Sequence, residues 1–258
     1  MDDITKQILL EKVRIVINDY KNHADELLKL INIHFDKETD RLKNISIITL
    51  QRYYTGLISI STLIEKFKFY NSIEFTYALI LRALILDFIT IEYLKAHKEF
   101  GIENWNKCLE QLNYLSAVET NRYCNSLVDD KEEFRKFISE FLFPENFDID
   151  SNTGNCRLKR SKPIKAWEMA CFFKDKKEPF AYDSYRLYNH YSLFEHINNL
   201  TFEAMNGDNS RDIENLFWSL FYIFHGHFSC LEILNFFPKH SQEIIDKRRI
   251  ILKLIDEI

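Results

Sequence analysis

Residues 57–100, LISISTLIEKFKFYNSIEFTYALILRALILDFITIEYLKAHKEF, contain neither glycine nor proline. Residues 102–143 also lack both, and the whole chain of 258 residues has 5 glycines and 4 prolines. Average usage would give roughly 18 glycines and 13 prolines in a chain of this length. Sheet proteins need a turn about every 8–12 residues, and tight turns rely on Gly, Pro, Asn and Asp. The scarcity therefore predicts an all-α fold, an irregular bundle of roughly eight to ten helices around one core.

The composition is that of a globular protein with a large core. Hydrophobic residues make up 46% and charged residues 28%, and the 22 Phe and 13 Tyr can each bury much apolar area. The net charge of −5 excludes a global basic field for nucleic acid. The 5 cysteines are scattered without a C-x-x-C pair, which favours reduced thiols in the cytoplasm. We expect one domain, 1–258, with any subdomain division in the polar loop 144–162.

Two apolar stretches require comparison with membrane spans. Residues 75–94 contain Arg82 and Asp87 near their middle, and residues 216–231 are shorter than the roughly 20 residues that a span needs. Both stretches are therefore predicted to be buried core helices.

Helical periodicity and capping residues divide the chain into segments. Ile4, Ile8 and Ile15 open the first pattern, Ser46 is the predicted cap of the second helix, and Ser116 with Glu119 forms a capping box that predicts a separate helix. The predicted helices are 3–43 (one helix or two in line), 47–70, 73–98, 102–115, 117–127, 131–142, 163–173, 181–205, 211–236 and 242–256.

The helix 181–205 carries one candidate polar site. Its polar residues recur at a spacing of three or four, so they share one face, and Ser192 and His196 are neighbours on it. His196 can act as a base or a hydrogen-bond donor near pH 7. The alternative is a polar face that contacts only solvent.

Arg82 and Asp87 are the second candidate, because charges within an apolar helix are costly unless they are paired. They lie about 140° apart around the helix, so each needs a partner from another helix. The 181–205 stripe is one source of partners, and a purely structural ion pair is the alternative. The combined candidate site comprises Arg82, Asp87, Tyr185, Tyr188, Ser192 and His196.

A third candidate is a basic segment that can bind phosphates or nucleic acid, or simply form a solvated loop. It contains Arg157, Lys159, Arg160, Lys162 and Lys165.

The sequence predicts no metal site and no cofactor. His225 and His227 are two residues apart and point to different sides of a helix, and Asp19 and His23 form a pair without a third ligand. No His-Glu-x-x-His, Glu-x-x-His or glycine-rich phosphate loop occurs.

Two segments resemble known families. Leu81-Arg82-Ala-Leu-Ile-Leu-Asp87-Phe and Tyr185-Arg-Leu-Tyr188-Asn-His-Tyr-Ser192-Leu-Phe-Glu-His196 together resemble uncharacterised all-helical bacterial families, some found beside phage-defence genes. The resemblance implies a helical bundle in which Arg82 and His196 meet. A looser similarity is to HEPN-type helical ribonucleases, which carry an arginine and a histidine separated by a spacer. Arg186 and His190 come closest to that pattern, with a shorter spacer.

Three functional hypotheses follow for a cytoplasmic protein. The first is an interaction or accessory protein in stress or phage defence, with a protein partner or self-association. The second is an HEPN-like RNA-binding or RNA-cleaving protein that uses the basic segment. The third is a small-ligand-binding bundle or enzyme with a site around Arg82 and His196.

Overall fold

The computed structural model confirms the all-α fold class, apart from one short β-hairpin. It describes residues 3–35, 40–66, 73–126, 131–149, 156–159, 161, 163–193, 210–235 and 238–257. The chain divides into two compact units, which we call unit 1 (Met1–Lys95 and Met169–Ile258) and unit 2 (Ala96–Glu168). The two boundaries, after Lys95 and after Glu168, therefore lie near the end of one helix and within another, and not in the polar loop 144–162.

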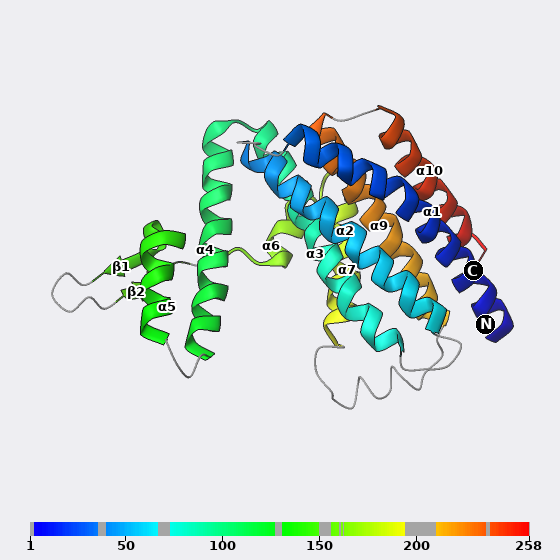
Figure 1. Cartoon of the computed structure of the whole chain (residues 1–258), viewed down its shortest axis with the longest axis horizontal. Coiled ribbons are helices and arrows are strands. Elements are labelled where there is room, and N and C mark those ends of the chain that lie inside the picture. Colours follow the sequence, from blue (N-terminus) through cyan, green and yellow to red (C-terminus); the bar gives the residue numbers. More distant parts are fainter. Residues whose placement is uncertain are drawn as a thin grey trace. The chain divides into compact units, whose positions relative to one another are not determined.

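Unit 1 is a bundle of long helices that lie side by side (Figure 1). Their bounds are α1 Asp3–Phe35, α2 Arg41–Lys66, α3 Ile73–Glu99, α7 Phe180–Ser192, α9 Ser210–Leu234 and α10 Pro238–Ile255. α3 continues four residues past the unit boundary, and the short α6, Ala166–Cys171, crosses the other boundary.

The core of unit 1 surrounds α9, which packs against α1, α2, α7 and α10. From Ile213 to Leu234 only Glu232 is exposed. The side that carries Glu214, Trp218 and His225 is only partly buried, and most of the other residues are buried. The four surrounding helices contribute residues such as Leu27, Leu57 and Ile251, all fully buried.

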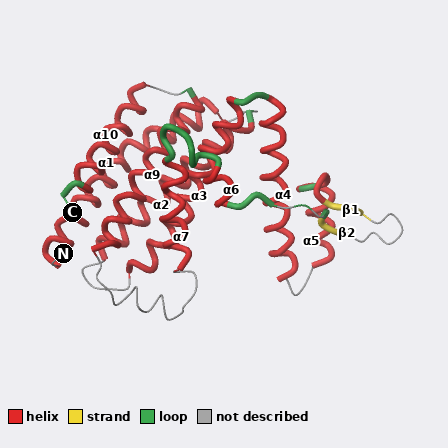
Figure 2. Tube along the Cα trace, turned by 180° about the vertical axis from the view of Figure 1, so that it is seen from behind, coloured by secondary structure: helices red, strands yellow, loops and turns green. Residues whose placement is uncertain are grey.

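Unit 2 contains shorter elements, and Figure 2 shows its two strands. The elements are α4 Ile102–Ser126, α5 Lys131–Phe137, the π-helix η2 Ile138–Leu142, the 3-10 helix η3 Pro144–Asn146, and strands β1 Phe147–Ile149 and β2 Cys156–Leu158. The strands are antiparallel, with Phe147 opposite Leu158. A small core of its own contains Ala117, Cys124, Ile138 and Phe147. The hairpin lies in the segment that the sequence predicted to be a loop.

Two predicted helix starts are wrong. α2 begins at Arg41 because the Asp40 carboxylate accepts hydrogen bonds from the backbone N–H of Leu42 (2.9 Å) and Lys43 (3.2 Å). Ser46 instead donates to the Leu42 carbonyl inside the helix (2.8 Å). Ser116 similarly donates to the Leu112 carbonyl (3.1 Å) within a continuous α4. A hydroxyl in a helix can bond the carbonyl four residues earlier, so a capping sequence does not by itself start a helix.

The first helix also buries a face other than the one that carries the first three isoleucines. Ile4, Ile8 and Ile15 are exposed, whereas residues such as Val13 and Ile17 are fully buried. The predicted final helix also starts earlier than 242, at Pro238, a residue whose fixed φ suits a first helical turn. Among the described residues, no helix combines the length and apolar character needed to cross a bilayer.

Side chains of α2 and α3 approach the backbone of α9 closely at Gly226. A Cβ atom there would overlap the hydroxyl of the fully buried Tyr53 and lie 3.1 Å from Cδ2 of Phe88. Gly226→Ala should lower the free energy of unfolding by about 1–3 kcal/mol, because overpacking outweighs the better helix propensity of alanine. Urea unfolding followed by circular dichroism measures this change.

Tyr53→Phe removes the overlapping oxygen, which has no hydrogen-bond partner among the described residues. In the Tyr53→Phe background, Gly226→Ala should therefore cost less than in the wild-type background. Equal costs in the two backgrounds would show that the Tyr53 hydroxyl is not the obstacle.

Candidate functional site

Arg82 meets two of the predicted polar residues of α7. Its Nε donates to the Ser192 hydroxyl (3.0 Å), and its Nη2 donates to the Tyr188 hydroxyl (3.0 Å). The guanidinium carbon also lies 4.8 Å from the centre of the Tyr188 ring. Arg82 thus has partners on the helix that the sequence named as one source: Ser192 belongs to the predicted stripe, and Tyr188 is another member of the combined candidate site.

The remaining members of the stripe lie beside or outside this contact. Tyr185 stacks on Tyr188 with a centroid separation of 5.7 Å, and Ser192 also donates to the Tyr188 carbonyl (2.8 Å). His196 lies outside the described residues. Because Arg82 already donates to two hydroxyls, the arrangement fixes α3 to α7, and a ligand would have to share or replace those bonds.

Asp87 does not belong to this cluster. Its Oδ2 lies 2.8 Å from Nε of Arg52 on α2, so Arg82 and Asp87 bind different helices, as their angular separation predicts. Burial raises the pKa of the Asp87 carboxyl to about 6, and the nearby Arg52 charge only partly opposes this shift.

The basic segment is exposed where the structure describes it. Arg157, Lys159 and Lys165 are exposed, while Arg160 and Lys162 lie outside the described residues. Lys159 lines a cleft of about 360 Å³ in unit 2, and its ammonium donates to the Glu145 carbonyl (2.7 Å). The full lining is Lys107, Glu110, Gln111, Asn113, Tyr114, Glu145, Asn146, Lys159 and Ser161.

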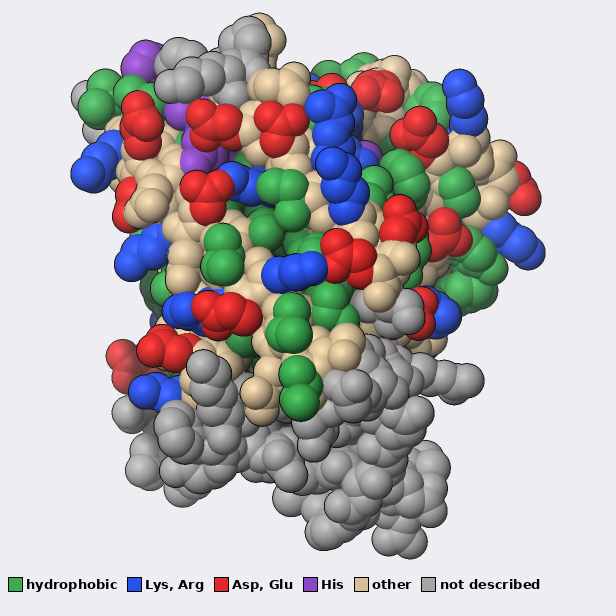
Figure 3. All heavy atoms as spheres, turned by 90° about the vertical axis from the view of Figure 1, so that its right-hand side faces the viewer, with side chains coloured by type: hydrophobic (Ala, Val, Ile, Leu, Met, Phe, Trp, Pro, Cys, Tyr) green, Lys and Arg blue, Asp and Glu red, His purple; other side chains and the backbone are tan. Residues whose placement is uncertain are grey.

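This cleft has mixed charge, because two glutamates accompany its two lysines. Figure 3 likewise shows basic, acidic and apolar side chains interspersed over the face that it presents. A polyanion gains most from a groove of one sign. The cleft therefore adds no support to phosphate binding by the basic segment, which stays a prediction.

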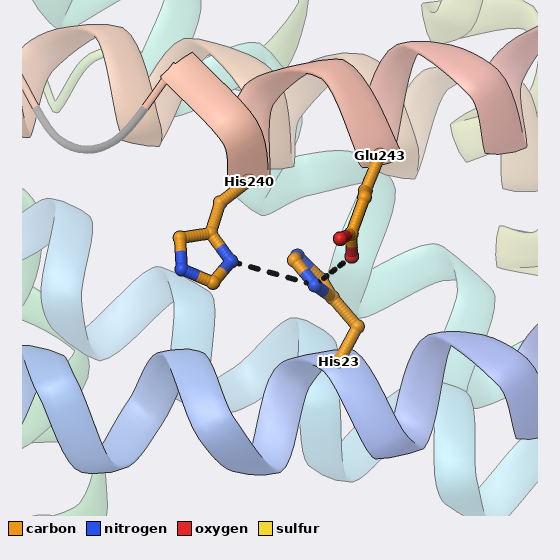
Figure 4. A group of neighbouring side chains, drawn as sticks. All are labelled: His23, His240 and Glu243. Atoms are coloured by element: carbon orange, nitrogen blue, oxygen red, sulfur yellow. Dashed lines mark hydrogen bonds and ion pairs between the residues drawn. The ribbon is translucent and has the colours of Figure 1, made fainter.

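The sequence analysis missed a cluster of three side chains in unit 1, which we call the His–Glu cluster: His23, His240 and Glu243. His23 comes from α1, and the other two come from α10 (Figure 4). Nδ1 of His240 lies 3.4 Å from Nδ1 of His23, which also contacts the Glu243 carboxylate. One ligand atom from each residue lies within 4.8 Å of the others.

The only sequence signal for this cluster was His240-Ser-Gln-Glu243, two ligand types at i and i+3. The reversed order, His-x-x-Glu, differs from the Glu-x-x-His pattern, which is absent from the sequence. The third member, His23, lies 217 residues from His240, a pairing that only the packing of α1 against α10 can reveal.

A second buried polar pair lies beside the cluster. The hydroxyl of Tyr20 lies 3.0 Å from Nδ1 of His227 on α9. Burial, together with the smaller effect of the nearby His23 and His240, lowers the pKa of His227 to about 3. His227 is consequently neutral at pH 7 and adds no positive charge near the His–Glu cluster.

Comparison of the chain with protein-family models, curated proteins and solved structures finds no match to any of them. The resemblance to helical bacterial families and to HEPN ribonucleases therefore stays a prediction.

The raised pKa of Asp87 predicts how stability depends on pH. Ionisation of this carboxyl lowers the free energy of unfolding, because its pKa of about 6 in the folded protein exceeds the ordinary value of 3.8. This cost is complete above about pH 6 and disappears as the pH falls toward 4. Asp87→Asn should therefore raise the free energy of unfolding by about 1–3 kcal/mol at pH 7.5 and change it little near pH 4.

Urea unfolding of both proteins from pH 4 to pH 8 measures the difference. Asp256→Asn is the control, because this exposed side chain near the C-terminus has a solvated carboxylate. A constant difference between Asp87→Asn and wild type at all these pH values would contradict the prediction.

Proposed function

We propose that this protein is an interaction protein that self-associates through an aromatic surface of unit 2. This aromatic surface consists of Tyr123 on α4, Phe134 and Phe137 on α5, and Phe141 on η2. The rings follow one another in contact, with centroid separations of 5.9 Å, 6.4 Å and 5.7 Å. This continuous run of rings is the observation that carries the proposal.

Three of these rings are largely open to solvent. Tyr123 is 59% exposed, Phe137 46% and Phe141 72%, and the adjacent Leu142 is 48% exposed. Phe134 also packs against the small core of unit 2, which anchors the surface. Contiguous exposed apolar side chains are costly in water and mark interaction sites, and aromatic residues are enriched at interface centres.

The π-helix helps to expose the surface. In η2, Ile138 and Ser139 are fully buried, while Phe141 and Leu142 project outward. π-helical turns are rare and occur often at functional sites, because the wider turn alters which side chains share a face.

The charges beside the aromatic surface favour a second copy of the chain as its occupant. Three ion pairs join neighbouring residues: Arg122 with Glu119, Arg135 with Glu132, and Lys136 with Glu140. Each charge of these three pairs already has an opposite charge beside it, so these pairs do not require a charged partner. Two copies of the surface would therefore not repel each other through these charges. A twofold interface places the same patch on both subunits.

Sedimentation velocity over a range of concentrations tests this proposal. The wild-type mass should rise from the 31.0 kDa of one chain toward that of a dimer. Phe141→Glu should weaken association by at least about 30-fold, because it places a charge on the most exposed ring of the proposed interface. Phe141 is mostly exposed, so the fold should tolerate the change.

Ile33→Glu on α1 is the matched control, because Ile33 is 74% exposed and belongs to unit 1. It should leave association unchanged. A wild-type protein that stays at the mass of one chain up to high concentration would overturn self-association, as would equal weakening by both variants.

A further inference from the structure

We propose that the His–Glu cluster is a binding site for one divalent first-row transition metal ion, with Zn²⁺ as the best match. Nδ1 of His23, Nδ1 of His240 and the carboxylate of Glu243 would be its protein ligands. This inference goes beyond the proposed interaction function and rests on a different unit of the chain.

The spacing of the two imidazole nitrogens matches a shared metal ion. Zinc–nitrogen bonds are about 2.0–2.1 Å long, so two nitrogens in a tetrahedral site lie about 3.3 Å apart. Nδ1 of His23 and Nδ1 of His240 are 3.4 Å apart. Figure 4 shows the two nitrogens facing one another, with the Glu243 carboxylate beside that of His23, so a metal ion would take the place of the hydrogen bond between them.

The donor set selects the class of metal. Two imidazoles and one carboxylate suit Zn²⁺, Co²⁺, Ni²⁺ and Fe²⁺, whereas Mg²⁺ and Ca²⁺ require mainly oxygen ligands. The cluster contains no thiolate, so it does not favour the softest ions. Three protein ligands leave at least one coordination position for water, as in zinc sites that perform chemistry rather than only stabilising a fold.

Burial makes the site selective while leaving a route to solvent. His23 is 8% exposed and His240 4%, whereas the Glu243 side chain is 38% exposed. The metal would lie at the margin of the core, with the open coordination position toward the Glu243 side. A partly buried site strengthens the attraction between the carboxylate and a divalent cation.

The two helices hold the ligands in register. α1 and α10 run antiparallel, since His23 faces His240, Asp19 pairs with Lys247, and Lys12 pairs with Glu257. His240 and Glu243 are three positions apart and project from the same face of α10. Ligands on two packed helices lose little conformational entropy when the ion binds.

A structural network without a metal is the competing explanation. In it, the two imidazoles share one proton, and a protonated His23 forms an ion pair with Glu243. A metal ion would displace that proton, so the two explanations differ in stoichiometric metal binding and in the spectrum of the bound ion.

Titration of the full chain with Zn²⁺ and with Co²⁺ tests the proposal. Calorimetry should show one Zn²⁺ per chain, and Zn²⁺ should raise the melting temperature because the ion binds the folded state. Co²⁺ should give the visible d–d bands of a four- or five-coordinate nitrogen and oxygen site. This wild-type spectrum does not depend on whether any variant folds.

His240→Gln and Glu243→Gln should each weaken Zn²⁺ binding by at least about 100-fold. Mutating a residue that only supports a metal ligand already costs up to about 100-fold, and these two residues would be ligands themselves. His34→Gln on α1 and Asp246→Asn on α10 are matched controls, since both residues are exposed and outside the cluster. Both controls should bind Zn²⁺ as the wild type does.

Three results would overturn the proposal: no stoichiometric binding by the wild type, unchanged affinity in His240→Gln and Glu243→Gln, or a cobalt spectrum with intense thiolate charge-transfer bands. The last result would assign the binding to a cysteine such as Cys156 or Cys171, neither of which is fully buried. Self-association is read from mass rather than from metal content, so the two proposals can fail separately.

Discussion

The burial of α9 is the constraint on which the rest of unit 1 depends. Nearly every residue of this helix between Ile213 and Leu234 is withdrawn from water. Each helix around it must therefore supply an apolar face, and one of them must approach its backbone closely. Gly226 permits that approach, because any side chain there would meet Tyr53. The packing of α2 and α3 on α9 thus depends on the absence of a single methyl group.

Burial leaves Nδ1 of His225 and Nε2 of His227 without hydrogen-bond partners among the described residues, but two polar side chains of this helix do bond to neighbouring helices. Ser219 bonds the hydroxyl of Tyr191 on α7 (3.0 Å), and His227 bonds the hydroxyl of Tyr20 on α1. An unpaired polar group in the core would cost about 1–3 kcal/mol. Alternative packings that slide α9 along its neighbours would break these bonds while keeping most apolar contacts. Polar pairs therefore select one arrangement among many that hydrophobic burial alone would allow.

The amino-acid sequence was sufficient for features that depend on local physics. The lack of Gly and Pro predicted long helices, and the angular separation of Arg82 and Asp87 predicted different partner helices. Helix starts were less certain, because Ser46 and Ser116 can bond a carbonyl inside a helix as well as cap one. The His–Glu cluster was out of reach for another reason. Its ligands meet only when the first and last helices pack together, and no local pattern encodes that contact.

The two proposed sites lie in different units, and the sizes of the two cores are the reason. Unit 1 buries so much apolar surface that it can hold a few polar groups in its core, which is where a rigid metal site can form. Unit 2 has a core of a few side chains, so it cannot bury all of its aromatic rings, and Phe137 and Phe141 stay exposed. A small core that leaves rings in water gains stability by association. The interaction surface is therefore expected on the smaller unit, and the metal site in the larger one.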